Sequence, residues 1–298
     1  MKHSLKITLV LLLLFLAAQL IGLFIVNRSI GNLPFGFERP DYNPNTSYVP
    51  IIIAILLGTG LVLLLAKFKA VKVWKFWFFL SVLFTLTIAF STLMNQWIAL
   101  ALALILSLWK TLKGNVIVNN LSELFIYAGL AAVFVPVINV LSAIILLIII
   151  SVYDAWAVWT SKHMVTLAEF QTESKVFAGL NIVYHTEESN KNPIKSTKNI
   201  SVKDSKDFLK STSKIQPKTK IAIIGGGDVA FPLLFASVIL KSTSSTGGML
   251  NAIIVSIVTT LALGGLLLFS KKDRYYPAMP FITAGCLFGY LIVWLISL

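Results

Sequence analysis

The chain has 298 residues, of which 57% are hydrophobic and only 12% are charged, and its mean hydropathy is +0.86. These values exclude an ordinary soluble globular protein and predict a protein that crosses a membrane several times. The net charge of +13 does not indicate a nucleic-acid binder, because the lysines collect in particular loops between apolar runs. The single cysteine, Cys286, excludes a disulfide framework and a four-cysteine metal site.

Nine apolar runs follow one another along the chain and predict an all-α membrane protein with nine transmembrane helices. The runs are 5–26, 50–66, 76–94, 97–112, 121–137, 140–160, 221–240, 249–269 and 281–298. The fourth is the shortest strongly apolar run, and it requires the Lys110 side chain to extend toward the membrane surface. Spans one to six thus occupy residues 1–160, and spans seven to nine occupy residues 221–298.

The loop charges predict the orientation of the spans. Lysines precede span one, follow spans two, four and eight, and crowd the segment 161–220, whereas the alternate loops hold few. By the positive-inside rule the N-terminus is cytoplasmic and the C-terminus is extracytoplasmic. We expect a multi-pass protein of the cell membrane. A cleaved signal peptide is the alternative for residues 1–27, but this apolar run exceeds the about 7 to 15 residues of a signal-peptide core.

The segment 161–220 is the only sizeable part outside the predicted spans. Its second half is rich in lysine, serine and threonine and poor in apolar residues, which predicts a mobile cytoplasmic loop. Residues 165–184 differ, because apolar side chains recur among polar ones. This pattern fits a short interfacial helix or a gate that leans on the membrane, and equally a frayed extension of span six.

Two aspartates, Asp154 and Asp228, lie inside the sixth and seventh runs. A carboxylate near the middle of a spanning helix costs at least about 2.5 kcal/mol, so each predicts a functional site with a partner. The loop 161–220 joins the two runs, and both are therefore measured from one membrane face. At 1.5 Å per residue both aspartates lie about 9 to 11 Å below that face, so two packed antiparallel helices can bring them together.

A pair of aspartates suggests acid–base chemistry. Two carboxylates about 4 Å apart repel by roughly 4 kcal/mol at an effective dielectric near 20, so near neutrality they share one proton. The ionised member can then deprotonate a water while the protonated member donates to a peptide carbonyl. The titration belongs to the pair, and the sequence does not assign the base.

Three glycines, Gly225, Gly226 and Gly227, directly precede Asp228. Glycine has no Cβ, so this segment lets a substrate backbone approach the carboxylate. The alternative is a dinucleotide-binding fingerprint, which we disfavour because Pro232 falls inside the helix that should follow. Close helix packing through small residues explains the glycines but not the acid.

The segment Pro277-Ala278-Met279 opens span nine on the same face as the aspartates. With Pro280, its prolines delay the helix and leave backbone groups free, which is tolerated at membrane depth where they line a cavity. We interpret the segment as a substrate-facing edge rather than as an ordinary helix start. Further along, Gly285 and Gly289 are spaced as GxxxG and predict close packing of span nine against a neighbouring helix.

Taken together, Tyr153-Asp154, the 225–228 sequence GGGD and the 277–279 sequence PAM resemble the YD, GxGD and PAL motifs of the presenilin and signal peptide peptidase family. The motif order resembles the family over the whole chain, and the compact size and orientation resemble archaeal presenilin homologues. The resemblance implies an intramembrane aspartyl protease that cleaves transmembrane helices. It implies that Asp154 and Asp228 are catalytic and that the glycines and the 277–279 segment bind substrate. The family has leucine where this chain has Met279.

The resemblance also implies that residues 215–221 could offer an extended edge to an unwound substrate. The expected partners are transmembrane-helix substrates and the lipid bilayer, without nucleic acid, and nothing in the sequence indicates the oligomeric state. We expect no cofactor and no metal, because there is no H-E-x-x-H motif and no histidine within a span. Alternatives are an ion- or proton-coupled transporter that uses the aspartates as its ion site, a prepilin peptidase, and a structural or chaperone membrane protein.

Overall fold

The computed structural model describes residues 5–29, 33–39, 41–161, 176, 178–186, 218–243, 247–270 and 276–296. Within these ranges there are nine helices of 17 residues or more and one two-stranded sheet. The helices are α1 (Leu5–Ser29), α2 (Tyr48–Lys67), α3 (Val71–Ser91), α4 (Gln96–Lys113), α5 (Val116–Phe134), α6 (Val140–Trp156), α9 (Gly226–Ser242), α10 (Gly248–Phe269) and α11 (Met279–Ile296).

Eight of these helices are long and apolar enough to cross a membrane when α6 is counted with its helical continuation to Thr160, and α9 is shorter, with 17 residues. The protein is therefore an integral, multi-pass membrane protein, and its predicted helical character is confirmed. A short helical turn that contains Pro136, Val135–Val137, separates α5 from α6. The lysine-rich second half of the predicted mobile loop lies almost wholly outside the described residues.

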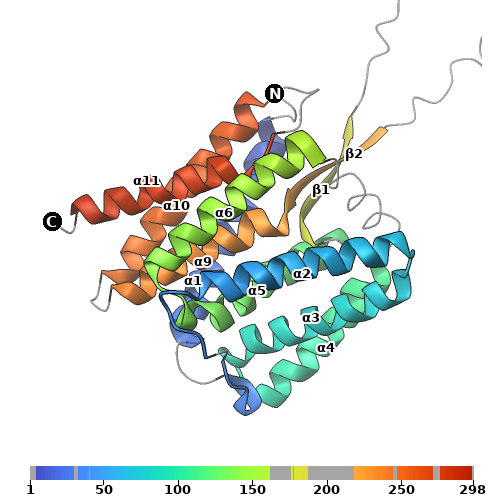
Figure 1. The fold of residues 1–298 in the computed structure, drawn as a ribbon. Helices are drawn as coiled ribbons and strands as arrows, with labels where there is room; N and C mark the ends of the chain where they lie inside the picture. Colours follow the sequence, from blue (N-terminus) through green and yellow to red (C-terminus); the bar gives the residue numbers. More distant parts are fainter. Residues whose placement is uncertain are drawn as a thin grey trace, which may run out of the picture.

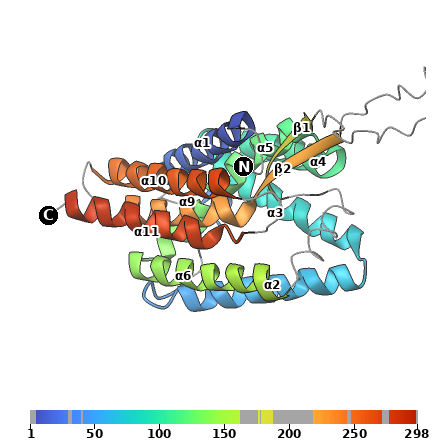
Figure 2. The same ribbon diagram turned by 90° about the horizontal axis from the view of Figure 1, so that it is seen from above.

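Helix α9 lies at the centre of the bundle, with α1, α5, α6, α10 and α11 around it (Figures 1 and 2). From Val229 to Leu240 every α9 side chain except Phe231 is buried. A helix that is apolar all round is stable only when other helices enclose it, and α9 has this environment. Helix α1 contributes the fully buried Phe15 to the same core.

A two-stranded antiparallel sheet precedes α9 and adds to the predicted all-α fold. Strand β1 (Gly179–Thr186) pairs with β2 (Lys218–Gly225), and Gly179 lies opposite Gly225. The described end of the 165–184 segment, from Gly179, is therefore a strand, and the interfacial-helix interpretation is wrong there. Span seven begins as a helix at Gly226 rather than at residue 221, because the five residues before it pair with β1.

The predicted close packing at the GxxxG spacing of α11 is confirmed. A Cβ on Gly285 would lie 2.6 Å from the Cβ of Ala262, and a Cβ on Gly289 would lie 2.9 Å from the Cα of Val255. Both contacted residues belong to α10, so any larger side chain at these glycines would push α10 and α11 apart.

The predicted extension of Lys110 toward the membrane surface is wrong. The residue is 4% exposed, and its Nζ lies 2.7 Å from Oε1 of Glu123 on α5. The ammonium group also donates a hydrogen bond to Asn119 Oδ1. A carboxylate on the neighbouring helix thus satisfies the cation inside the bundle, so Lys110 does not have to reach water.

Candidate active site

The structure brings Asp154 and Asp228 to one cavity. Asp154 lies in the last turn of α6 and Asp228 in the first turn of α9. Both carboxylates are half-buried, line a cavity of about 350 Å³ and are close enough to interact electrostatically. Each lies at a helix end rather than mid-helix, since α6 passes into a π-helical turn after Trp156 and α9 begins at Gly226.

The rest of the cavity wall is almost entirely apolar, and four helices contribute to it. Helix α2 runs beside α6 along one side of the bundle (Figure 2). The lining side chains from these two helices are Ile52, Ile55 and Leu56 of α2 and Ile149, Ile150 and Tyr153 of α6. Phe231 of α9 and Met279 of α11 complete the apolar lining. An apolar segment can therefore enter without desolvating polar groups other than the carboxylates.

The start of α11 positions the Asp154 carboxylate. The backbone N–H of Met279 donates to Oδ2 of Asp154 at 3.1 Å, and the backbone of Ala278 interacts with the same carboxylate. The first N–H groups of a helix have no partner within it, so Pro277, by delaying α11 until Met279, leaves them free for Asp154. Of the three residues, Met279 lines the cavity, whereas Pro277 and Ala278 are not among its lining residues.

The three glycines before Asp228 divide between two roles. Gly225 and Gly227 line the cavity, and a Cβ on Gly225 would lie 3.1 Å from Oδ2 of Asp228. Gly226 faces the other way, because a Cβ there would lie 3.3 Å from both the Ala178 carbonyl oxygen and the Tyr127 hydroxyl. The backbone N–H of Gly226 donates to that carbonyl at 3.3 Å. Gly226 thus fits a packing role, whereas the other two leave room beside the carboxylate.

Gln19 is a polar residue near the site that the sequence reasoning did not identify. It lies on α1, is fully buried, and its Nε2 donates to the Val229 carbonyl oxygen at 3.0 Å. Pro232 has no N–H and so leaves the Asp228 carbonyl without its usual helical donor. Gln19 bonds the next carbonyl along the chain, and so adds a hydrogen bond to the first turn of α9 beside the one that Pro232 removes. A lone amide inside the first apolar run was the available sequence signal.

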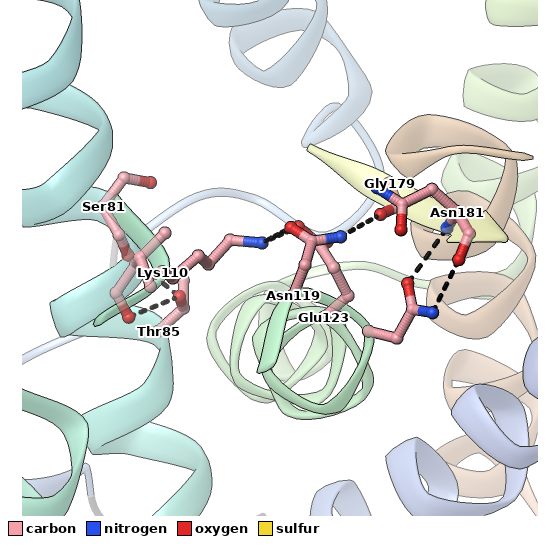
Figure 3. Close-up of polar contacts among 9 residues, drawn as sticks. Ser81, Thr85, Lys110, Asn119, Glu123, Gly179 and Asn181 are labelled. Carbon is pink, nitrogen blue, oxygen red and sulfur yellow. Dashed lines mark hydrogen bonds and ion pairs between the residues drawn. The ribbon is translucent and has the colours of Figure 1, made fainter. Parts of the chain in front are cut away.

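The sequence reasoning also missed a polar network between α4 and α5. Figure 3 shows its hydrogen bonds, which run from Lys110 through Asn119 to Gly179. The Nδ2 of Asn119 donates to the Gly179 carbonyl oxygen of β1 at 2.9 Å. The sequence signal for the pair was that Lys110 and Glu123 carry opposite charges and lie on two consecutive spans connected by a short turn. Among the residues that the structure describes, no three His, Cys, Asp or Glu side chains gather as metal ligands.

Comparison with known proteins gives a consistent picture. The family model "Signal-peptide peptidase, presenilin aspartyl protease" matches residues 10–298. Two similar solved structures are each described as a presenilin family intramembrane aspartate protease, in space groups C222 and P2. The first is 20% identical, covers 97% of this chain and 99% of its own, and has a TM-score of 0.63. The second is 20% identical, covers 96% of both chains, and has a TM-score of 0.59. No curated protein matches.

Proposed function

Because the chain belongs to the signal-peptide peptidase and presenilin aspartyl protease family, we propose that it is an intramembrane aspartic endopeptidase of the GxGD type. It hydrolyses peptide bonds within the transmembrane helices of other membrane proteins. The observation that carries this proposal is the pair Asp154 and Asp228, which face one apolar cavity from two adjacent helix ends.

The chemistry follows from the placement of the pair. Two interacting carboxylates with few polar neighbours hold one proton between them near neutrality, because a second negative charge is strongly disfavoured. The ionised member removes a proton from a water as that water attacks the peptide carbonyl carbon. The protonated member donates to the carbonyl oxygen, and a gem-diol intermediate forms without a covalent bond to the enzyme. The amide to Asp154 from Met279 holds one carboxylate in place during these transfers.

The proposal requires an unwound substrate segment. In an α-helix each peptide C=O already accepts a hydrogen bond from the N–H four residues further on, and the side chains surround the backbone. A substrate helix must therefore unwind around the bond to be cleaved, beside the two carboxylates that line the cavity. The strand β2 leads directly into Gly225 and Asp228, and it offers such an extended segment a pairing edge.

The membrane arrangement is part of the proposal. All nine helices span the bilayer of the cell membrane, with the N-terminus and the segment 161–220 in the cytoplasm and the C-terminus outside. This orientation places Asp154, Asp228 and the sheet in the cytoplasmic half. Loop lysines support it, although Lys110 no longer contributes because it is paired inside the bundle. Lys113, which is exposed at the end of α4, remains on that face.

The test is cleavage of a panel of single-span peptides by purified protein in lipid, with the products identified by mass spectrometry. Asp154→Asn and Asp228→Asn should each lower the rate by at least about a thousandfold, since the pair acts as a unit. Asp41→Asn, in an exposed loop, is the matched control and should cleave normally. Ion flux that depends on Asp228, without peptide products, would establish the alternative of an ion- or proton-coupled transporter.

A further inference from the structure

Strand β1 has an outer edge that faces α5, and a side-chain amide occupies it. The Nδ2 of Asn120 donates to the Asn181 carbonyl oxygen at 2.7 Å, and the Asn181 N–H donates to Oδ1 of Asn120 at 3.0 Å. A neighbouring strand would make this same pair of bonds. One residue earlier on α5, Asn119 binds the Gly179 carbonyl oxygen at 2.9 Å (Figure 3). Two adjacent asparagines thus cap the outer edge of β1.

The pairing register shows which groups of β2 remain open. Asn181 lies opposite Ile223, and its N–H and C=O point away from β2. In an antiparallel pair the facing residue then also directs its N–H and C=O outward, and the pattern repeats every second residue. Ile221 and Ile223 therefore present backbone groups on the outer edge of β2. Within the described parts of the chain no hydrogen bond reaches these groups, and both side chains are about half exposed.

The helix that carries the two asparagines is itself held by charge. Asn119 Oδ1 accepts from Lys110 Nζ, and the same ammonium group pairs with Glu123 one turn further along α5. Lys110 and Glu123 are 4% and 1% exposed. Hydrogen bonds to buried charged groups are stronger than neutral ones. Asn119 is consequently fixed in orientation, and Asn120 is held by its own two bonds to Asn181.

The outer edge of β2 leads to the catalytic carboxylate. Gly225 lies two residues after Ile223, on the same edge of the strand, and its backbone interacts with the Asp228 carboxylate. A shift of β2 by one residue would exchange its buried side chains for its exposed ones and move every backbone group along the edge. The placement of β1 thus determines where a paired substrate would meet the aspartates.

We propose that Asn119 and Asn120 form a side-chain clamp on the outer edge of β1, so that an unwound substrate can pair only with β2. Asn120 is accordingly a positioning residue that selects which peptide bond reaches Asp154 and Asp228. This inference rests on the proposed proteolytic function.

Asn120→Leu tests the clamp, because leucine has a similar size and makes neither bond. Loss of two hydrogen bonds should shift the ratio of minor to main cleavage positions about tenfold in mass spectra of the products. Backbone hydrogen exchange in the peptide that contains Asn181 should accelerate by a similar factor. Asn120→Asp keeps the acceptor for the Asn181 N–H and loses the donor, so it should give an intermediate shift and serve if the leucine variant folds poorly.

Asn115→Leu is the matched control, since Asn115 caps the same helix through Ile117 N and does not reach the sheet. It should lower stability without changing the cleavage positions or the exchange near Asn181. Unchanged cleavage positions in both Asn120 variants, with an active wild-type enzyme, would overturn the clamp. Unchanged hydrogen exchange near Asn181 in the Asn120 variants would also overturn the clamp, whether or not the wild-type protein is active. A wild-type protein that cleaved no peptide would refute the proposed function, which is a separate result.

Discussion

Helices α2 and α5 lie on opposite sides of α9 (Figure 2) and differ greatly in how they pack. Of the apolar window in α2, 6% is buried, against 56% for the window that begins with α5. Gly58 and Gly60 of α2 have open space where a Cβ would stand. Gly129 of α5, by contrast, has the Thr85 carbonyl oxygen 2.0 Å from that point. The helix behind the sheet, α5, is tightly packed, and α2, which lines the cavity, is only lightly attached.

The two helices therefore have different structural roles. Helix α5 holds β1 through Asn119 and Asn120, and β1 holds the strand that leads to Asp228. Helix α2 supplies apolar lining residues to the cavity but makes few other contacts. Lipid solvates an apolar helix as well as a protein neighbour does, so moving α2 away costs little. Helix α2 is therefore the side of the cavity that can move most easily, whereas α5 holds the sheet in place.

The largest effect should come from removing the buried cation behind α5. Lys110→Met leaves the Glu123 carboxylate buried without a partner, which should lower the free energy of unfolding by about 3 to 5 kcal/mol. Thermal unfolding in detergent measures the loss. Lys113→Met, three residues on and exposed, is the control and should unfold like the wild type. The double variant Lys110→Met/Glu123→Leu should recover most of the stability, and a fully stable single variant would show that the pair contributes nothing.

A smaller effect should separate the glycines of the two helices. Gly129→Ala forces α3 and α5 apart, and such overpacking costs typically about 1 to 3 kcal/mol. Gly58→Ala meets no atom and should instead stabilise α2 by up to about 1 kcal/mol, because alanine favours the helix. Unfolding curves of the two variants in one detergent compare them directly. Equal shifts of the same sign would contradict the packing difference between α2 and α5.

Enlarging an α2 side chain that lines the cavity should have the smallest effect on folding. It should nevertheless reduce activity clearly. Ile55→Trp places a large ring among the lining residues. It should reduce kcat/KM about ten- to hundredfold by displacing the substrate segment, with little change in unfolding temperature. Leu57→Trp is the matched control, because Leu57 is 69% exposed and does not line the cavity. If both variants cleaved at the wild-type rate, α2 would not form a substrate-contacting wall.

Much of the membrane architecture follows from local sequence. A helix crosses a bilayer because about 20 successive residues are apolar, and the summed hydropathy of these residues does not depend on which helices pack beside them. The nine runs accordingly match the nine long helices among the described residues, with ends shifted by a few positions. Asp154 and Asp228 also stood out on local grounds, since an acid inside an apolar run needs a functional reason.

Tertiary structure alone decided the features that depend on a partner. The apolar stretch 221–225 is as suitable for a helix as for a strand, and pairing with β1 makes it a strand. Lys110 could reach water or a carboxylate, and the position of Glu123 on α5 decides for the carboxylate. The two roles of the glycines depend in the same way on what faces each one. Hydropathy measures how a segment transfers into lipid, whereas these outcomes depend on which helices meet and at what height.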